Sequence, residues 1–357
     1  MASSWTLAVD RTDLLRSCLV EGEVPVPDEG EAVLRVDRVG MTANNVTYAV
    51  LGDAFRYWEF FPAPEPGQGL VPLWGFADVV ESRAPGVEPG QRVYGYLPPS
   101  SHLRVRPARP DARGFRDASP HRAELPSPYN AYALTTGDAA YEADREDLQV
   151  LFRPLFFTSF VLADALGDGG LQGARRVVLS SASSKTAYGT ASLLRDQDVE
   201  VVGLTSSGNT AFTSALGCYD RVLSYDAVTD LDRDTPTAYV DLAGSTDLRR
   251  VLHEHLGDAL VRDVVVGVTH QDSAPAGTLG GVRPQVFFAP DQMRKRTGDW
   301  GRDGLDDRFG EAWRRFAPLA QEHTDVRVSE GPEGLARVWH EVASGSSAPR
   351  TGNVVQL

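Results

Sequence analysis

The chain has 357 residues, and 35 Lys and Arg residues stand against 49 Asp and Glu residues, a formal net charge of -14. This acidic balance argues against a nucleic-acid-binding domain, while 42% hydrophobic and 24% charged residues are typical of a soluble globular chain of roughly two domains. The sequence has neither an uncharged apolar run of about 18 residues nor the pattern of a signal peptide. We therefore expect a cytoplasmic protein that binds neither membrane nor nucleic acid.

The first 150 residues are predicted to form a β-rich domain. Residues 31–41 alternate near period two, residues 73–82 are mostly apolar, and residues 85–97 combine turn residues with a strand. Residues 98–146 are rich in Pro, Arg and Asp and carry no long periodicity, so we expect an extended covering loop or domain border there.

Residues 151–290 change to an alternation of helices and strands. Helices are expected at 153–166, 186–198 and 246–256, and strands at 175–180, 199–205, 221–225, 237–243, 262–270 and 284–290. This alternation predicts an α/β fold with a doubly wound parallel sheet.

The last segment, residues 291–357, is polar and charged at its start and is too short for a third independent core. A helix at 306–322, a strand at 324–329 and a helix at 332–343 are expected. We therefore predict domains at 1–150 and 151–290, with 291–357 returning to the first domain.

A loop of small residues between a buried strand and a helix is the most informative segment. Backbone N–H groups and the helix dipole at such a turn favour an anionic phosphate. We predict that the loop binds a pyrophosphate through Ser181, Ser183, Ser184, Lys185 and Thr186. Serines stand where a dinucleotide-binding turn carries glycines, a replacement that requires no residue with positive φ. A capped helix with a solvated lysine is the alternative interpretation.

A phosphate-binding loop of the ATP-hydrolysing type is disfavoured by register. Its two glycines would fall on Leu179 and Ser184.

The end of the following strand indicates which dinucleotide is bound. NAD-binding units carry a carboxylate there for the ribose, whereas a 2'-phosphate needs neutral or positive donors. The sequence instead offers hydroxyl and amide groups from Thr205, Ser206 and Asn209. It therefore favours NADP (NADPH) over NAD, with plain loop polarity as the alternative.

The order of these features resembles the medium-chain dehydrogenase/reductase superfamily. The turn PGVEPGQRVYGY and the stretch ALGCYDRVLSYD are similar to segments of its quinone and enoyl reductases. The stretches YAVLGD, RPLFFTSF, SSASSKTA and FFAPDQMRKRTGDWG resemble a domain-of-unknown-function branch of it. The resemblance implies a GroES-like first domain, a Rossmann second domain, an active site in the cleft between them, and a homodimer.

The same resemblance implies a zinc-free protein with no metal site. Zinc-dependent members carry Gly-His-Glu where this chain has Gly75, Phe76 and Ala77. His253 and His255 do not restore a ligand set, because residues two apart on a helix do not share a face.

Segment 40–53 resembles the substrate site of zinc-free reductases and supplies the catalytic candidates. Tyr48 is the first candidate donor to a carbonyl or enolate, because a phenol can both hydrogen-bond and deliver a proton, and Asn44 is the second. A core aromatic residue and a turn amide are the alternatives. His270 is expected at the ligand edge of the parallel sheet, either as a contact to nicotinamide or substrate or as a structural histidine.

A basic run follows the last strand, and within it Arg294 is a candidate for binding the cofactor phosphates. The alternative is a solvated face paired with nearby aspartates.

These features predict a zinc-independent, NADPH-dependent oxidoreductase. It would transfer a hydride to an enone, enoyl thioester, quinone or other carbonyl compound, a small-molecule substrate. The alternatives are an NADPH-binding protein without redox turnover, such as a sensor or biosynthetic accessory subunit, and a non-redox lyase on the same scaffold.

Overall fold

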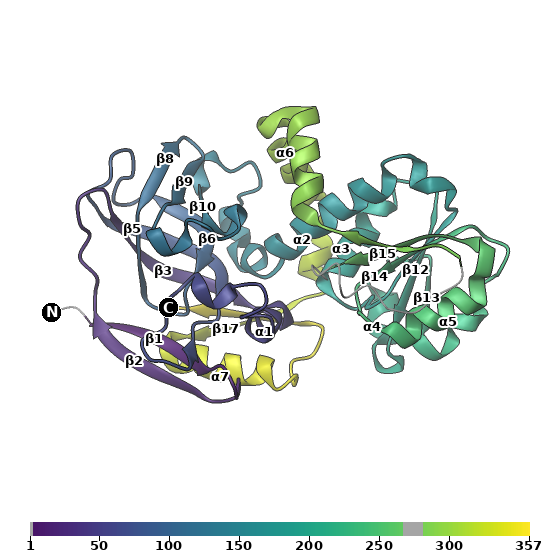
Figure 1. Ribbon diagram of the computed structural model, residues 1–357, viewed down its shortest axis with the longest axis horizontal. Helices are drawn as coiled ribbons and strands as arrows, with labels where there is room; N and C mark the ends of the chain where they lie inside the picture. The colour runs from purple at the N-terminus through teal and green to yellow at the C-terminus, as the bar shows by residue number, and fades with distance from the viewer. Residues whose placement is uncertain (1–2, 267–280) are drawn as a thin grey trace. The chain divides into compact units, whose positions relative to one another are not determined.

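The computed structural model describes residues 3–266 and 281–357 (Figure 1). Packing divides the chain into a first unit, Met1–Pro154 with Thr324–Leu357, and a second unit, Leu155–His323. Residues 291–323 therefore group with the second unit, and residues 324–357 group with the first. The domain boundaries at 150 and 290 that the sequence suggested stay a prediction.

The first unit contains two β-sheets. Within the described residues, the larger has the order β17-β18-β3-β5-β6-β10-β9-β8, with β7 paired to β3. Its strands are β17 (Asp325–Glu330), β18 (Thr351–Gln356), β3 (Ala32–Met41), β5 (Leu73–Ser82), β6 (Arg92–Leu97), β10 (Ala131–Leu134), β9 (Gly114–Asp117), β8 (Pro107–Asp111) and β7 (His102–Val105). The smaller consists of β2 (Ser17–Glu23), β1 (Ser3–Asp10) and β4 (Gln68–Gly69).

Short helices complete this unit. They are α1 (Ala43–Val50), α7 (Gly331–Ala343) and the 3-10 turns η1 (Tyr57–Glu59), η2 (Pro120–Arg122), η3 (Ser127–Asn130), η4 (Thr135–Gly137) and η5 (Ala143–Arg145).

Strands β5 and β6 present two different faces. Alternation places Leu73, Ala77, Val93 and Leu97 in the aliphatic core of the unit. The intervening residues pair across the strands as Trp74 with Tyr96 and Phe76 with Tyr94. We call these four residues the aromatic face. Tyr96 and Phe76 are completely buried, so this face is a second packed layer.

The expectation of an extended loop over residues 98–146 is wrong, because β7 to β10 lie there. Each of these strands has only four or five residues, too few to establish a period in the sequence. β8 lies at the end of the sheet and contains Pro107 and Pro110, which an edge strand tolerates because one of its sides lacks a partner.

The second unit contains a parallel sheet in the order β13-β12-β11-β14-β15-β16, with α3, α4 and α5 beside it (Figure 1). The strands are β11 (Arg176–Leu179), β12 (Glu200–Thr205), β13 (Arg221–Ser224), β14 (Thr237–Asp241), β15 (Leu260–Val266) and β16 (Pro284–Phe287). The helices are α3 (Lys185–Leu194), α4 (Thr210–Ala215), α5 (Thr246–Leu256) and α6 (Ala289–Glu322). All pairs are parallel, so the predicted α/β fold with a doubly wound sheet is confirmed.

Helix α2 (Glu146–Gly167) joins the two units. With the short turn before it, Ala143–Gly167 is the one helix of the described chain that is long and apolar enough to cross a membrane by length and composition. Half of its most apolar window is buried, and Leu151, Phe152 and Phe156 are core residues. A core helix of a folded domain accounts for this composition.

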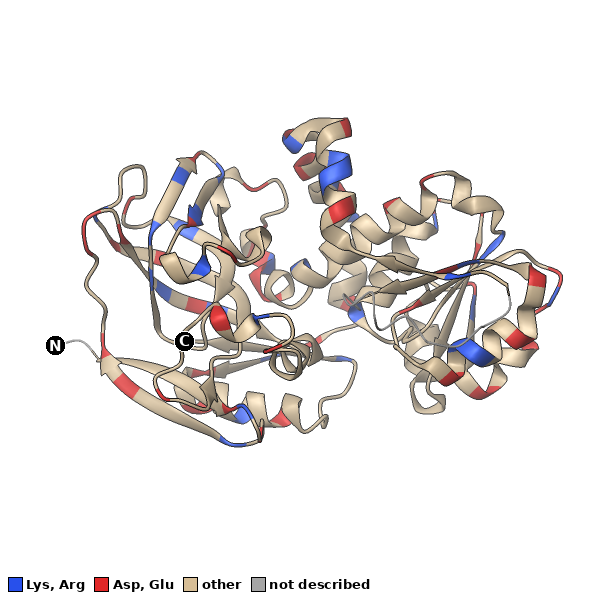
Figure 2. Cartoon of the chain, in the orientation of Figure 1, with Lys and Arg blue, Asp and Glu red and all other residues tan. Residues whose placement is uncertain are grey.

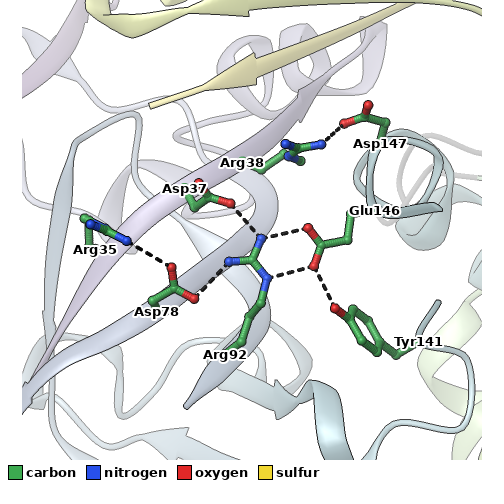
Figure 3. A network of polar contacts seen from close by, with 8 residues as sticks. All are labelled: Arg35, Asp37, Arg38, Asp78, Arg92, Tyr141, Glu146 and Asp147. Carbon is green, nitrogen blue, oxygen red and sulfur yellow. Dashed lines mark hydrogen bonds and ion pairs between the residues drawn. The ribbon is translucent and has the colours of Figure 1, made fainter. Parts of the chain in front are cut away.

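Acidic and basic residues are interspersed along both units (Figure 2). In the first unit, Arg92 of β6 is held by three carboxylates (Figure 3). Its guanidinium donates to Glu146 at 2.7 Å, to Asp78 at 2.9 Å and to Asp37 at 2.6 Å. Glu146 lies in the first turn of α2, so this network attaches the start of α2 to strands β3, β5 and β6.

Removing the Arg92 guanidinium should destabilise the first unit. Arg92→Met leaves three carboxylates close together, of which only Asp78 keeps a cation among the described residues, and we expect a loss of about 2–3 kcal/mol in the free energy of unfolding. Arg35→Met is the matched control, because Arg35 is 56% exposed and makes one pair with Asp78 at 3.3 Å. The control should lose less than about 1 kcal/mol in chemical denaturation. Equal losses would contradict a specific role for Arg92.

Candidate functional site

The predicted phosphate loop lies at the carboxyl end of β11, at the centre of the parallel sheet. Residues 180–184 connect β11 to α3, and Ser184 is the N-cap of α3, its hydroxyl accepting from the Ala187 N–H at 3.3 Å. The loop turns tightly, because the Ser184 N–H donates to the Ser181 carbonyl at 2.8 Å. The amino end of α3 is therefore preceded by a compact, serine-rich turn.

Ser181 adopts a left-handed conformation, with φ of 52°. The sequence interpretation required that no position in the loop have positive φ, and this requirement is wrong. A serine in this conformation is strained because of its Cβ atom, whereas a glycine would not be. The Ser181 N–H donates to the Tyr225 hydroxyl at 3.1 Å, which fixes the turn.

Tyr225 is a site residue that the sequence reasoning did not assign. It follows β13 and lies in the stretch ALGCYDRVLSYD, so its position in that stretch was the available signal. Burial raises the pKa of Tyr225, so the phenol keeps its proton. Because its oxygen accepts from Ser181, the hydroxyl proton remains available for donation to another group.

Three of the predicted cofactor residues come together at the ends of neighbouring strands. Thr205 at the end of β12 donates from its hydroxyl to Ser183 Oγ at 3.4 Å, and Asn209 Nδ2 donates to the same oxygen at 3.3 Å. A serine hydroxyl has two acceptor lone pairs and one proton. With both lone pairs engaged, Ser183 has to act as a donor toward any further partner.

Lys185 begins α3 and is half-buried. Burial lowers the pKa of Lys185 to about 8, so the ammonium loses its proton more readily than a solvated lysine. Thr186 follows it on the first turn, and its carbonyl accepts from Ser159 Oγ at 2.8 Å.

The other two candidates for cofactor binding lie outside these contacts. Ser206 is exposed just beyond β12. Arg294 lies on α6, is 75% exposed and pairs with Asp291 at 3.1 Å. The structure therefore shows the aspartate pairing that was the alternative for Arg294, and it gives no contact between Arg294 and the loop.

Two glycines near the loop lie too close to neighbouring side chains to carry a Cβ atom. A Cβ on Gly203 of β12 would lie 2.8 Å from Ala182 Cβ, so only glycine lets β12 pass this near the turn. A Cβ on Gly189 of α3 would lie 2.7 Å from Ser159 Oγ of α2. Glycine is thus required beside the loop and on α3.

A buried polar network lies beneath the loop. The Asp241 carboxylate at the end of β14 accepts from Ser180 Oγ at 3.0 Å and from the Gly244 N–H at 2.9 Å. Arg249 of α5 donates to Asp241 at 2.6 Å and lies 3.1 Å from Asp263 of β15. The network joins the carboxyl ends of β11 and β14 to α5, which positions the loop.

His253 belongs to this network and not to a metal site. Its Nε2 lies 2.8 Å from the Asp263 carboxylate, while His255 Nε2 lies 2.8 Å from the Leu231 carbonyl. Burial raises the pKa of Asp263. Over residues 3–266 and 281–357, no group of three or more His, Cys, Asp or Glu side chains is arranged to hold a metal ion.

The catalytic candidates of the first unit lie beside the aromatic face. Tyr48 of α1 is 6% exposed, and its hydroxyl accepts from Trp74 Nε1 at 3.1 Å. The Asn44 side chain lies one turn earlier on α1 and acts to lower the pKa of Tyr48, against the larger effect of burial. The structure therefore brings Tyr48 and Asn44 together, in a setting that also fits the alternative of a core tyrosine.

The neighbouring Asn45 has a structural task. Its Oδ1 accepts from the Thr42 N–H at 2.8 Å and its Nδ2 donates to the Pro72 carbonyl at 2.9 Å, so it caps α1 and attaches it to the strand region. Phe76, which stands where zinc-dependent proteins carry histidine, packs against Tyr94 at 5.2 Å and Tyr141 at 5.8 Å between ring centroids. His270 lies outside the described residues.

The two units have the architecture that the resemblance implied. A β-rich, mostly antiparallel unit and a six-stranded parallel unit match the GroES-like and Rossmann folds that medium-chain dehydrogenases and reductases combine. CurA from Vibrio vulnificus in complex with NADPH aligns over 99% of both chains with a TM-score of 0.64 and 13% identity. The CurK enoyl reductase aligns over 99% of both chains with a TM-score of 0.62 and 13% identity.

A quinone oxidoreductase from Coxiella burnetii aligns over 100% of both chains with a TM-score of 0.58 and 13% identity. At these identities the similarity establishes the fold. Residues 39–348 match the family described as "Protein of unknown function (DUF2855)", and the chain belongs to this family. No curated protein matches the sequence.

The left-handed conformation of Ser181 leads to a prediction about the free energy of unfolding. Ser181→Gly should relieve the strained φ and raise the free energy of unfolding by up to about 1 kcal/mol. Ser183→Gly is the matched control, because Ser183 is not among the described non-glycine residues with positive φ and should lose about 1 kcal/mol. Thermal unfolding of both variants measures the difference. A loss at position 181 as large as that at 183 would count against the strained turn.

Proposed function

We propose that the protein is a zinc-independent, NADPH-dependent reductase. The observation that carries the proposal is the cluster of Ser183, Thr205 and Asn209 at the carboxyl end of the parallel strands, in which the Ser183 oxygen accepts two hydrogen bonds and keeps its own proton for donation. A site of hydroxyl and amide donors suits the 2'-phosphate of NADPH better than the ribose hydroxyl of NADH.

The second unit would hold the cofactor. Ser181, Ser184 and Thr186 would approach the pyrophosphate at the amino end of α3, where the helix dipole adds favourable potential. Lys185 would add the positive charge, and the Tyr225 hydroxyl a further donor. CurA, crystallised with NADPH, has the same overall fold and supports this assignment.

The first unit would act on the acceptor. A reduced nicotinamide supplies a hydride when it is bound, and the acceptor then gains negative charge that has to be met by a donor. Tyr48 would deliver a proton to the developing enolate or alkoxide. Asn44 would help to orient the phenol.

The planar rings around Tyr48 suit a conjugated acceptor such as an enone, an enoyl thioester or a quinone.

A second candidate function is an NADPH-binding protein without redox turnover. The observation in its favour is the deep burial of Tyr48, whose oxygen already accepts from Trp74. Mixing the protein with NADPH and a panel of enones, quinones and aldehydes separates the two functions. NADPH that binds but is oxidised by no acceptor would favour the non-redox candidate.

Lys185 provides the test of cofactor binding. Because its pKa is lowered to about 8, the ammonium is charged at neutral pH and becomes neutral as the pH rises through that value. NADPH affinity should therefore be full below about pH 8 and fall above it. Lys185→Met should weaken NADPH binding about 10-fold at neutral pH and abolish this pH dependence. Calorimetry or nicotinamide fluorescence measures both effects.

Lys295→Met is the control, since Lys295 is the other lysine of the chain and pairs with Asp168, the residue just after α2. It should leave NADPH affinity unchanged. If neither NADPH nor NADH binds to the folded wild-type protein, the proposed function is wrong.

Tyr48→Phe tests the proton donor. The substitution keeps the ring and removes the hydroxyl, so turnover should fall about 100-fold while NADPH affinity stays the same. Tyr57→Phe is the matched comparison, because the Tyr57 ring centroid lies 4.7 Å from that of Tyr48. Steady-state kinetics with a fixed acceptor measures both variants. A larger loss at Tyr57 would transfer the role of donor to that residue.

A further inference from the structure

The Tyr48 hydroxyl has a fixed hydrogen-bond donor on one side. The indole N–H of Trp74 lies 3.1 Å from the phenol oxygen, and an indole nitrogen can only donate. The phenol oxygen therefore accepts this bond, and the Tyr48 proton has to point in another direction. The orientation of the phenol follows from the chemistry of Trp74.

Trp74 is itself held in place by aromatic contacts. Its ring stacks on Tyr94 with centroids 5.7 Å apart and an interplanar angle of 15°. The ring of Tyr96 lies 5.0 Å away, and that of Tyr129 lies 5.9 Å away. The guanidinium of Arg153 lies 4.4 Å from the Tyr94 ring centroid, so a cation–π contact extends the stack. The indole N–H is therefore preorganised.

Asn44 is a second polar residue beside Tyr48. It lies on α1 four residues before Tyr48, the spacing that brings two side chains to one helix face. The Asn44 amide acts on the pKa of Tyr48 in the same downward sense as the Trp74 N–H. An amide N–H that donates to the phenol oxygen would have this effect.

We infer that Trp74 and Asn44 are positioning residues for Tyr48, two donors that stabilise the phenolate formed when Tyr48 gives up its proton and that direct this proton away from the protein's own acceptors. This inference rests on the proposed function, in which Tyr48 is the proton donor. It assigns Trp74 a role that the sequence reasoning did not give it.

The physical need for such donors follows from burial. Tyr48 is 6% exposed, and a phenolate without water is strongly disfavoured. Burial raises the pKa of Tyr48 above that of a solvated phenol. Hydrogen bonds to a charged oxygen are stronger than those to a neutral one, so both donors stabilise the state after proton transfer more than the state before it.

Other titratable groups also face Tyr48 and enter the interpretation of any pH profile. They are Tyr57 of η1, Tyr96 of β6 and Tyr129 of η3, each in ring contact with it, and Tyr94 of β6, which interacts with it electrostatically. All are phenols with pKa values raised by burial, so each holds its proton more tightly than a solvated phenol, and the fluorine resonance of position 48 separates its titration from theirs.

The experiment places 3-fluorotyrosine, a more acidic phenol, at position 48 and follows its fluorine resonance with pH. Trp74→Phe keeps an aromatic ring but removes the N–H, so the fluorophenol should titrate about one pKa unit higher, and Asn44→Leu should act in the same direction. With natural Tyr48, Trp74→Phe should lower kcat about 10-fold and leave acceptor KM and NADPH affinity near their wild-type values.

Two further variants sharpen the test. Trp5→Phe removes another indole from the first unit and should change neither the titration nor kcat. Asn44→Asp replaces a donor by an acceptor that would capture the Tyr48 proton, so it should lower kcat more than Asn44→Leu does. If Trp74→Phe does not fold, replacing Trp74 by 3-benzothienylalanine keeps its shape without the N–H, and the same upward titration is expected.

An unchanged titration of the fluorophenol on removal of the Trp74 N–H would overturn the inference, as would equal kcat values for Asn44→Leu and Asn44→Asp. The titration needs neither NADPH nor an acceptor. If the fluorophenol pKa rises in Trp74→Phe as expected but the wild-type protein turns over no acceptor, the positioning of Tyr48 is supported and the proposed reductase is contradicted.

Discussion

The carboxylate of Asp241 is completely buried, and the arrangement of the second unit follows from the need to satisfy its charge. The Ser180 hydroxyl, backbone N–H groups after β14 and the guanidinium of Arg249 all meet this one group. Because Ser180 is the first residue of the predicted phosphate loop, moving the loop would remove one of the hydrogen bonds that satisfy the buried carboxylate. The position of the candidate cofactor site is thus set by a network beneath it, on the rigid strand ends of the sheet.

The first unit meets the same constraint with aromatic side chains. Strand alternation separates an aliphatic core from the aromatic face of β5 and β6. On that face the Trp74 N–H donates to the Tyr48 oxygen, whereas the hydroxyls of Tyr94 and Tyr96 are buried without a hydrogen-bond partner in the described part of the chain. Arg92 needs three carboxylates instead, because a guanidinium carries several donors and a full charge. Each of these arrangements fixes the orientation of its side chains and also stabilises the unit.

Local sequence patterns predicted most of the helices and strands. They did not predict which residues distant in the sequence form hydrogen bonds with each other. Helix Thr246–Leu256 was predicted with the bounds observed, because amphipathic spacing and a serine cap are local signals. The four short strands between residues 102 and 117 and at 131–134 carry too few residues for such a signal. The polar residues that follow the predicted strands indicated Ser183, Thr205 and Asn209 as candidates for one site. The partners of Ser180 and Tyr48 lie 61 and 26 residues away, and no local pattern states such a distance.

The loss of glycines from the loop has a physical consequence for the proposed function. In a glycine-rich turn the backbone N–H groups face the phosphate directly. Here the Ser181 N–H is engaged by the Tyr225 hydroxyl, and the Ser183 oxygen is engaged by Thr205 and Asn209. Each of these contacts occupies acceptor lone pairs and leaves a hydroxyl proton to donate. In the proposed function, recognition of a phosphate would therefore pass from backbone amides to the side-chain hydroxyls of Ser183 and Tyr225, so that function does not require the glycine pattern.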